Sequence, residues 1–360
     1  MKIKKIIISG GGTGGHLYPA LALAEELKSR FPYFEILFVG AIGRIEMKKV
    51  PAAGYKIIGL WVDGFQRKLT FKNFLFPFKL FFSLIKSLYI VLNYRPNIVI
   101  GTGGYASGPL IFVASFFRIP SLIQEQNSYP GFTNKILSNR VNVISVAFDG
   151  LERFFPKEKI VVTGNPVRKS IRNLIINQAS AKLFFGHNPN KQTLVVLGGS
   201  LGAKKINKMI AEKLDWFESL DIQIIWQCGS LYFDEYKDLV KHGVSLFSFI
   251  SEMDKLYASA DIIISRAGAG TLSEICCVGK PTILIPSPNV AENHQLHNAI
   301  ALEKLNAAIV LTEKKLVNDF EMVFTNLMKK KKQIEVIKNL KKISKPNATK
   351  EIIDLVQDLI

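Results

Sequence analysis

The sequence predicts an α/β protein made of two doubly wound domains. The chain has 360 residues, more than a single hydrophobic core usually holds. Apolar runs rich in β-branched residues alternate with helical stretches from end to end, a pattern typical of parallel sheets covered on both faces. These runs are Ile3–Ser9, Ile36–Val39, Ile98–Gly101, Ser121–Gln124, Val143–Val146, Ile160–Thr163, Leu194–Leu197, Ile222–Trp226, Ile262–Ser265 and Thr282–Ile285.

The second half of the chain repeats the plan of the first. Ile3–Ser9 leads into the glycine loop Gly10–His16 and a helical stretch from Pro19 to Arg30. Thr193–Leu197 likewise leads into Gly198–Ala203 and another helix. Two similar domains are therefore expected.

The hinge between these domains is expected at Gly164-Asn165-Pro166-Val167-Arg168, which can continue neither a strand nor a helix. A last helix, Thr349–Ile360, follows the break at Pro346 and can cross back to the first domain. The expected domains are residues 1–164 with 346–360, and residues 165–345.

The formal net charge of +18 predicts an acidic partner, and nucleic acid is the obvious candidate. The excess is concentrated in Arg67–Lys86, Lys329–Lys332 and Lys338–Lys345, with no zinc-finger spacing or RNA-recognition signature beside it. We therefore expect no nucleic-acid partner, and the C-terminal lysines equally suit a solvated surface.

The three cysteines, Cys228, Cys276 and Cys277, cannot form a disulfide framework, and the adjacent pair could not easily share a metal. A reducing cytoplasm is the expected compartment. The apolar stretch near the start runs only from Ile6 to Ile8, which is too short for a signal-peptide core. We expect the protein to stay inside the cell.

The first glycine loop predicts a site for an anionic or sugar-like ligand. Glycines let the backbone approach a ligand closely, and the N–H groups and dipole of the following helix favour phosphate oxygens. His16 adds a side chain that titrates near neutrality and can take a proton from a substrate hydroxyl. The alternative is a tight turn in which His16 only caps the helix.

A dinucleotide site must also be considered, because Gly10, Gly12 and Gly15 read as G-x-G-x-x-G. That fold places an acid at the end of the second strand to hold the adenine ribose. Here the second strand, Glu35–Val39, ends in Gly40-Ala41 and offers no carboxylate. A dinucleotide site fits poorly.

Glycine-rich loops follow four of the predicted strands, at Gly10–His16, Gly101–Pro109, Gly198–Ala203 and Arg266–Thr271. Two of these loops lie in each half of the chain. Together they predict a ligand cleft between the domains that is lined by backbone N–H donors.

The second half adds polar side chains to its glycine loops. Thr271, Ser273 and Glu274 lie at the start of a helix beside Gly268–Gly270. The helix start suits a diphosphate, and the carboxylate of Glu274 can accept two hydroxyls of a ribose or sugar. Glu292–Asn298 supplies amide groups of the kind that bind sugar hydroxyls.

Metal ligands are hard to find. His294 and His297 could be two ligands of a zinc site, but no third ligand lies at a convincing spacing. D-x-D does not occur, so a Mg²⁺ ion on a nucleotide diphosphate has no obvious ligand pair. Helix dipoles and Arg168 are left to neutralise a leaving group. We expect neither a metal nor a cofactor.

In order along the chain stand GGTGGH, GTGGYASGP, QEQN, GNPVR, GGSLGA, SRAG-x-x-T-x-SE and NHQ-x-x-NA. From residue 6 to about 300, this combination resembles glycosyltransferase family 28, the bacterial lipid I N-acetylglucosaminyltransferases. The resemblance implies a GT-B fold, in which two Rossmann-like domains face each other across a cleft. It also implies inverting transfer of N-acetylglucosamine from UDP-N-acetylglucosamine to the C4 hydroxyl of the muramoyl sugar of undecaprenyl-diphospho-muramoyl-pentapeptide. That step makes lipid II from lipid I in peptidoglycan synthesis, on which cell shape and division depend.

By the same resemblance, the first domain binds the acceptor. Its diphosphate and sugar would face Gly11, Gly12, Thr13, Gly14, Gly15, Gly103, Gly104, Tyr105 and Asn127. The base that takes the acceptor proton is expected to be His16, with Glu125 as the alternative, because a carboxylate in a closed cleft can also serve.

The second domain would bind the donor. The residues implied for UDP-N-acetylglucosamine are Thr13, Gly14, Gly15, Asn127, Arg168, Ser200, Ile250, Ala269, Gly270, Thr271, Glu274, Gln295 and Asn298. Arg168, Ser200 and the Gly268–Thr271 loop would hold the diphosphate. Phe249-Ile250 would hold the uracil, Glu274 the ribose, and Gln295 with Asn298 the sugar hydroxyls. Gly270 replaces a Leu that we expect in some relatives, which affects only the fine positioning of the donor.

Residues 71–92 are apolar enough to suggest a membrane span, but Pro77, Lys79 and Lys86 interrupt them, and a span would open the βα domain. A helix with one face on the sheet cannot bury all of these side chains. The surplus predicts an exposed patch among Phe74, Leu75, Phe76, Phe78, Leu80, Phe81, Phe82, Leu84 and Ile85, ringed by Lys68, Lys72, Lys79 and Lys86. We expect this patch to bind anionic lipid at the cytoplasmic face of the cell membrane, as a peripheral contact.

Two other classes of function stay open from the residues. A nucleotide-sugar epimerase of the same two-domain type would share the donor half and would need no lipid acceptor. A non-enzymatic basic protein that binds membranes or nucleic acid would explain the charge, but it leaves the glycine loops and Glu274 without a purpose.

Overall fold

The computed structural model describes residues 3–64, 74–199 and 201–360. The chain divides into two compact units, Met1–Val167 with Asn347–Ile360, and Arg168–Pro346. We call them domain 1 and domain 2. The boundaries expected from the sequence, after residues 164 and 345, differ from these by three residues and one residue.

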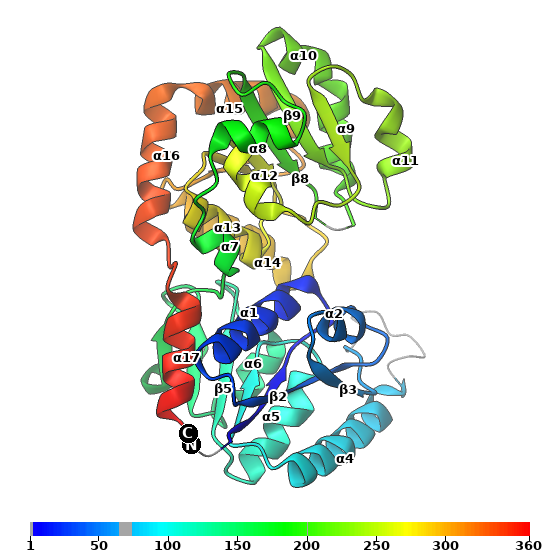
Figure 1. Cartoon of the computed structure of the whole chain (residues 1–360), viewed down its shortest axis with the longest axis vertical. Helices are drawn as coiled ribbons and strands as arrows, with labels where there is room; N and C mark the ends of the chain where they lie inside the picture. The colour runs from blue at the N-terminus through cyan, green and yellow to red at the C-terminus, as the bar shows by residue number, and fades with distance from the viewer. Residues whose placement is uncertain (1–2, 65–73, 200) are drawn as a thin grey trace. The chain divides into compact units, whose positions relative to one another are not determined.

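Domain 1 is built on a parallel sheet with helices on both faces (Figure 1). The strand order is β3-β2-β1-β4-β5-β6-β7, and every neighbouring pair is parallel. The strands are β1 Lys5–Ser9, β2 Glu35–Ala41, β3 Lys56–Leu60, β4 Ile98–Gly101, β5 Ser121–Glu125, β6 Val143–Val146 and β7 Ile160–Val162.

Alternate residues of the strands of domain 1 enter two hydrophobic cores, one on each face of the sheet. Ile6 and Ile8 of β1 pack in one core, while Ile7 packs in the other. The first core is covered by α1 Gly14–Arg30, α2 Glu46–Ala52 and α17 Ala348–Asp358. The second is covered by α4 Phe76–Tyr94, α5 Ser107–Phe116 and α6 Phe132–Leu137, and a short 3₁₀ helix, η1 Lys157–Lys159, precedes β7.

The last helix of the chain returns to domain 1, as the sequence predicts. Ile352, Ile353 and Val356 of α17 are buried in the core beneath α1, and the two helices lie side by side (Figure 1). Lys4 Nζ donates a hydrogen bond to the carbonyl of Ile360 at 2.7 Å, which brings the two ends of the chain together.

Helix α1 begins five residues earlier than we expect from the sequence, at Gly14 rather than at Pro19. Thr13, in an extended conformation, is its N-cap residue. Proline is favoured at the first helical position, but Pro19 lies inside this helix. His16 therefore belongs to the first helical turn and not to the loop before it.

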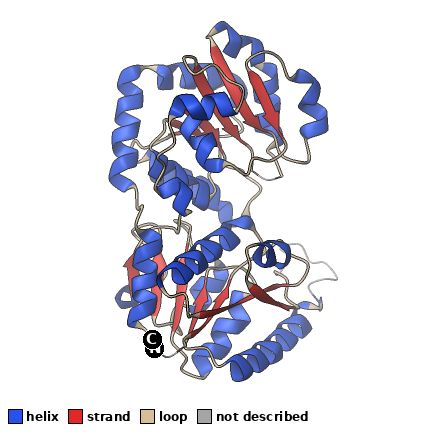
Figure 2. Ribbon diagram, in the orientation of Figure 1, coloured by secondary structure: helices blue, strands red, loops and turns tan. Residues whose placement is uncertain are grey.

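Domain 2 repeats the plan, with strands flanked by helices (Figure 2). The sheet order is β10-β9-β8-β11-β12-β13, again parallel throughout. Its strands are β8 Gln192–Leu197, β9 Ile222–Gln227, β10 Val244–Phe247, β11 Ile262–Ser265, β12 Thr282–Leu284 and β13 Ile309–Val310. Its helices are α7 Lys169–Arg172, α8 Gln178–Phe184, α9 Lys204–Glu212, α10 Leu214–Ser219, α11 Phe233–Tyr236, η2 Lys237–Leu239, α12 Met253–Ser259, α13 Ala269–Val278, η3 Ala291–Asn293, α14 His294–Glu303, α15 Leu316–Met328 and α16 Lys330–Ile343.

Candidate active site

The first glycine loop of domain 1 connects the end of β1 to the start of α1. The N–H of Gly11 donates to the carbonyl of Gly103 at 3.4 Å, and the N–H of Gly12 donates to Glu46 Oε2 at 2.9 Å. The N–H groups of Gly14 and Gly15 open α1, where the helix has no preceding carbonyl to offer them. The donors that this loop offers to an anion therefore lie at the start of α1 rather than at Gly11 and Gly12.

His16 is half-buried in the first turn of α1, and its ring orientation is set by two acceptors. Nδ1 lies 3.0 Å from the carbonyl oxygen of Thr102 and 3.1 Å from Oε1 of Gln126. A carbonyl oxygen can only accept, so Nδ1 carries the proton and donates it. The lone pair of the neutral ring is then on Nε2, for which the described part of the chain supplies no hydrogen-bond partner.

The acceptors of His16 are themselves fixed in a buried network. Gln126 Nε2 donates to the carbonyl of Thr102 at 2.7 Å, which also establishes that Gln126 Oε1 faces the imidazole. Asn165 Nδ2 donates to the carbonyl of Gln126 at 3.1 Å, and Gln124 Nε2 donates to Asn165 Oδ1 at 2.8 Å. The network joins the end of β5 to the segment after β7.

Glu125, the alternative base, lies at the end of β5 with 1% of its surface exposed. Its Oε1 accepts from the N–H of Asn127 at 3.0 Å and from Asn127 Nδ2 at 3.2 Å. Its Oε2 accepts from the N–H of Gly131 at 3.0 Å and from Asn134 Nδ2 at 2.8 Å. This carboxylate therefore organises the loop that follows β5, with both oxygens already occupied.

The second glycine loop, which follows β4, closes over the first. Gly103 has φ +91°, and a Cβ at this position would lie 2.7 Å from Nδ1 of His16. A Cβ on Gly104, at φ +87°, would overlap the carbonyl oxygen of Gly11. Only glycine allows this contact between the loops. The exposed ring of Tyr105 lies beside Gly12, so the acceptor residues expected from the two loops do lie together with His16.

Domain 2 pairs two of the residues that we expect to contact the donor. The guanidinium of Arg168 donates to Glu274 Oε1 from Nε at 3.1 Å and from an Nη at 2.7 Å. We expect Arg168 to hold the donor diphosphate and Glu274 to hold the ribose, two different parts of the ligand. In this structure they neutralise each other.

The other oxygen of Glu274 is bound by Tyr257, which the sequence analysis does not identify. Tyr257 Oη donates to Glu274 Oε2 at 2.9 Å, and its ring is fully buried on α12. Burial, and then the negative charge of Glu274, raise the pKa of Tyr257 well above its usual value of 10.0. Tyr257 is therefore a permanent neutral donor to Glu274.

The loop before α13 is open where a ligand is expected. Gly268 is the N-cap of α13, which begins at Ala269, and Thr271 is half-buried in its first turn. A Cβ on Gly270 would meet nothing within 4 Å. A Cβ of the Leu that we expect in some relatives therefore meets no clash at this position.

Three other residues that we expect to contact the donor make hydrogen bonds within domain 2, each between a side chain and the backbone. Ile250 is buried, and its N–H donates to Gln227 Oε1 at 2.9 Å. Gln295 Oε1 accepts from the N–H of Ser287 at 2.9 Å. Asn298 is buried, with its Nδ2 3.5 Å from the carbonyl of Ala267. Ser200, assigned to the donor diphosphate, lies outside the described residues.

The side chains that could bind a metal or act as a reactive thiol offer few candidates among the described residues. Within residues 3–64, 74–199 and 201–360, no group of three or more His, Cys, Asp or Glu side chains is placed to hold a metal ion. Burial raises the pKa of Cys228 to about 11 and the pKa of Cys276 to about 12, so both are neutral thiols at physiological pH.

Sequence reasoning missed Glu46, Thr102, Gln126 and Tyr257. Gln126 lies within the QEQN motif and Thr102 within the GTGGYASGP motif, and these places are the available signals. Glu46 and Tyr257 reach the site from helices that lie outside the glycine loops and the other motifs. Thr102 contributes its backbone carbonyl, which the identity of its side chain does not reveal.

Two family matches cover most of the chain. Residues 6–146 match the glycosyltransferase family 28 N-terminal domain, and residues 193–356 match the glycosyltransferase family 28 C-terminal domain. The UDP-N-acetylglucosamine–N-acetylmuramyl-(pentapeptide) pyrophosphoryl-undecaprenol N-acetylglucosamine transferase of Flavobacterium psychrophilum is 53% identical over 362 residues, with 100% of this chain and 99% of that protein covered. The protein of the same name from Christiangramia forsetii is 50% identical over 357 residues, with 99% and 98% covered.

Solved structures extend the likeness. MurG of Acinetobacter baumannii superposes with a TM-score of 0.79 at 27% identity, covering 99% of both chains. A UDP-N-acetylglucosamine 2-epimerase superposes with a TM-score of 0.66 at 13% identity, covering 99% of this chain and 95% of that one. At that identity the epimerase shares the fold alone.

Proposed function

Because this chain belongs to glycosyltransferase family 28 and has its GT-B fold, we propose that it transfers N-acetylglucosamine from UDP-N-acetylglucosamine to the C4 hydroxyl of the muramoyl sugar of lipid I, which makes lipid II in peptidoglycan synthesis. The observation that carries the proposal is the likeness to transferases of this name along the whole chain. Fold alone would not suffice, because an epimerase shares it.

The reaction is a single displacement at the anomeric carbon of the donor sugar. The acceptor oxygen forms a bond to that carbon on the face opposite UDP, while the bond from the carbon to the diphosphate oxygen breaks. His16 Nε2 takes the proton of the acceptor hydroxyl, and UDP leaves with the electron pair. The hydrogen bond from Nδ1 to Thr102 supports this role, because it holds the ring in the tautomer whose Nε2 can accept.

Glu125 is a poorer base in this arrangement. Its two oxygens already accept four hydrogen bonds. A proton on either oxygen would face one of these N–H donors, and the hydrogen bond from that donor would be lost. We propose that Glu125 instead keeps Asn127 in place on the acceptor side.

Donor binding exchanges partners on domain 2. The Arg168 guanidinium would turn from Glu274 to the negatively charged diphosphate, and ribose hydroxyls would donate to the Glu274 Oε1 that Arg168 leaves. The Tyr257 hydroxyl remains on Oε2 throughout, so the carboxylate keeps its orientation while one partner replaces the other.

The experiment that tests this function offers the protein labelled UDP-N-acetylglucosamine with and without a short-chain lipid I analogue. We expect label to appear in the lipid product only when the acceptor is present, with release of one UDP per sugar transferred. Conversion of UDP-N-acetylglucosamine to its C2 epimer without acceptor would contradict the transferase and support an epimerase. The matched control is the His16→Ala variant, which keeps the donor residues and lacks the proposed base.

We further propose that domain 1 binds the cytoplasmic face of the membrane through α4 and α5. Among the described helices, α4 is the one long and apolar enough to cross a membrane by length and composition, which is weak evidence for a span. Its inward face carries small side chains, Ser83 and Ser87, with Ile90 and Val91. The outward face carries exposed aromatic and aliphatic side chains, Phe78, Phe81, Phe82, Ile85, Leu88, Tyr89 and Leu92.

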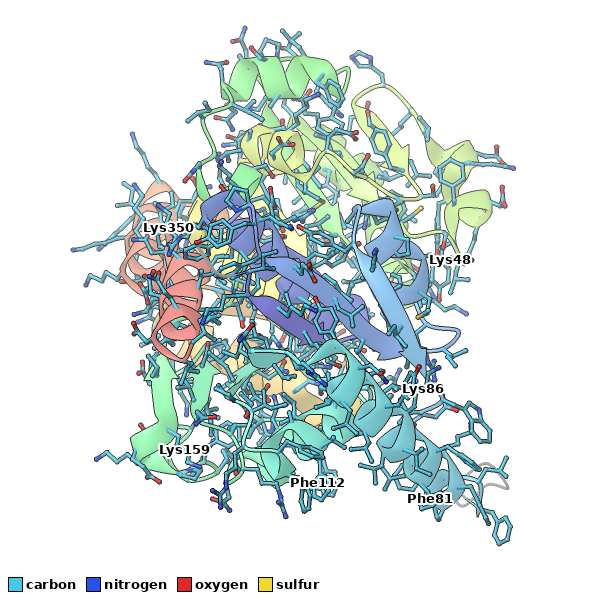
Figure 3. The ribbon with its side chains drawn as sticks, turned by 60° about the horizontal axis from the view of Figure 1, so that its bottom comes forward. Lys48, Phe81, Lys86, Phe112, Lys159 and Lys350 are labelled. Atoms are coloured by element: carbon cyan, nitrogen blue, oxygen red, sulfur yellow. The ribbon has the colours of Figure 1, made fainter. Side chains whose placement is uncertain are left out.

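Helix α5 extends this apolar surface. Phe112 and Phe116 of α5 are exposed, Phe116 over 77% of its area, and α4 packs directly against α5. Figure 3 shows Phe81 and Lys86 on α4 and Phe112 on α5, all on the side of domain 1 that is turned toward the viewer. Exposed aromatic and aliphatic side chains that gather on two neighbouring helices are typical of a surface that is covered in use.

The basic residues around this apolar surface differ partly from those expected. Lys86 is exposed, but Lys79 is tied to Asp63 and lies over the ring of Trp61, so it is poorly available to lipid. Lys68 and Lys72 lie outside the described residues. Arg118 and Arg140 are exposed instead, with the Arg140 guanidinium 4.7 Å from the ring centre of Phe112. These cations support attraction to anionic lipid.

A further inference from the structure

Glu46, at the start of α2, is an acidic residue with no exposed surface that lies directly beneath the first glycine loop. Its two carboxylate oxygens accept from two different backbone segments. Oε1 accepts from the N–H of Ala41, at the end of β2, and Oε2 accepts from the N–H of Gly12, both at 2.9 Å. A buried carboxylate is unfavourable unless it is hydrogen-bonded, so these two bonds are what permits its burial.

The glycines around Glu46 leave room for its side chain. A Cβ on Gly11 would overlap the carboxylate, and a Cβ on Gly40 would lie 2.5 Å from Cγ. Neither position has a positive φ, so it is the space taken by Glu46, and not the backbone conformation, that requires glycine at both. The end of β2, the start of α2 and the glycine loop are thus shaped around one carboxylate.

The opposite side of the loop is held by the second glycine loop. Gly11 donates to the carbonyl of Gly103, and Gly104 lies against the carbonyl of Gly11. Gly11 and Gly12 are therefore fixed between Glu46 on one side and Gly103-Gly104 on the other. Thr13, the N-cap of α1, follows immediately, so the position of Gly12 sets where the first N–H groups of the helix point.

We propose that Glu46 is a positioning residue for the acceptor diphosphate, an inference that rests on the proposed function. The carboxylate is negative and cannot bind the anion itself. By occupying the Gly12 N–H, it leaves the diphosphate to the N–H groups at the start of α1, and it holds those groups in one geometry. The two carboxylate oxygens are both needed, because a carboxamide has only one acceptor oxygen and would turn its NH₂ toward one of the two N–H donors.

The test compares Glu46→Gln with Glu158→Gln, which changes an exposed glutamate of the same domain in the same way. Glu46→Gln is expected to raise the KM for a lipid I analogue about tenfold or more in steady-state transfer assays, while its affinity for UDP alone, whose proposed contacts Arg168 and Glu274 lie on domain 2, stays within about twofold by calorimetry. Glu158→Gln should leave both constants unchanged. An unchanged acceptor KM in folded Glu46→Gln overturns the proposal, and so does an equal loss of affinity for UDP alone, because that would indicate a general loss of structure.

Hydrogen exchange supplies a readout that needs no activity. The amide of Gly12 should exchange slowly in the wild-type protein and at least about tenfold faster in Glu46→Gln, while the core amides of β1 keep their protection. Equal exchange at Gly12 in both proteins overturns the proposal. If the wild-type protein transfers no sugar to lipid I, the proposed function fails, and Gly12 exchange still decides whether Glu46 holds the loop.

A second variant covers the case in which Glu46→Gln does not fold. Glu46→Asp keeps the charge but is one methylene shorter, so it cannot reach Ala41 and Gly12 together. We expect it to fold and to show a smaller rise in acceptor KM, of about threefold to fivefold, with faster exchange at Gly12. Wild-type values for both overturn the proposal.

Discussion

The carbonyl oxygen of Thr102 decides which nitrogen of His16 can take a proton, because it accepts a hydrogen bond from Nδ1. If His16 is the base, His16→Ala should lower kcat by about 10²–10⁴-fold. Its affinity for UDP, measured by calorimetry, should stay unchanged, since the donor residues Arg168 and Glu274 lie on domain 2. Retention of wild-type kcat in this variant would remove His16 from the chemistry.

Glu125→Gln tests the alternative base. An amide cannot accept all four hydrogen bonds that the carboxylate accepts, so we expect the free energy of unfolding to fall by about 1–3 kcal/mol. The kcat of the folded variant should fall much less than that of His16→Ala. Urea unfolding and transfer assays measure the two quantities, and a larger loss of kcat in Glu125→Gln would reverse the roles.

The Tyr257–Glu274 pair carries a prediction for donor affinity. Glu274→Ala should weaken UDP binding by about tenfold or more, because the ribose hydroxyls lose a charged acceptor. Tyr257→Phe keeps the ring and removes only the bond to Oε2, so it should weaken UDP by about fivefold. Calorimetry with UDP alone measures both. Tyr236→Phe, at another buried tyrosine of domain 2, is the matched control and should bind UDP normally.

Residues that act through other residues are the part of the site that sequence reasoning finds least. His16 and Glu274 can be predicted because they stand in or beside glycine loops, where their chemistry suits the expected ligand. Glu46 and Tyr257 influence the site through contacts with Gly12 and Glu274, which are 34 and 17 positions away in the chain. No local pattern records such a contact.

At the scale of elements, helix α4 presents serines to the interior and phenylalanines to solvent, the reverse of the usual order. If this face inserts into a membrane, Phe78→Ser with Phe81→Ser should lower partitioning to anionic vesicles about tenfold, because two aromatic side chains no longer leave water. Co-sedimentation with liposomes measures it, and added salt should also weaken binding. Phe184→Ser, on domain 2, is the control.

Two outcomes of the vesicle experiment would count against the membrane contact. Equal pelleting with neutral and anionic vesicles at low salt would remove the electrostatic part, which depends on Lys86, Arg118 and Arg140. No pelleting with either kind of vesicle would remove the whole proposal.

The strands that the sequence predicts are continuous apolar runs, including the partly exposed edge strand β7. Central strands such as β1 and β8 are continuous apolar runs, and the structure confirms them. The strands missed are β3, β10 and β13, at the edges of their sheets. Edge strands have fewer neighbours to bury them, and β3 and β10 are indeed only partly buried, so their sequences need not be apolar throughout.

At the scale of the whole molecule, His187 makes the stability of domain 2 depend on pH. The side chain is 3% exposed, and the Gln223 side chain beside the ring compensates only part of the cost of charging it. Burial, with the positive charge of Lys182 nearby, lowers the pKa of His187 below its usual 6.5. The folded domain therefore resists protonation at a pH where the unfolded chain accepts a proton.

The stabilising effect of a neutral His187 should be complete above pH 6.5 and should decline as the pH falls from 6.5 toward the lower pKa of the folded state. The free energy of unfolding should fall by at most about 1.4 kcal/mol per pH unit from this group. Urea unfolding of a Trp61→Phe protein, in which Trp216 and Trp226 report on domain 2, measures it. His187→Gln should flatten the slope, and an unchanged slope in this variant would assign the pH dependence to other groups.

The return of α17 to domain 1 has a consequence for how the chain is made. A ribosome emits the polypeptide in order, so all of Arg168–Pro346 is outside the exit tunnel before Ile352, Ile353 and Val356 are. Domain 2 is continuous and can complete its sheet during translation, whereas domain 1, although emitted first, waits with the groove beside α1 uncovered. A nascent chain stalled before residue 347 would therefore leave exposed the apolar side chains that α17 covers in the finished protein.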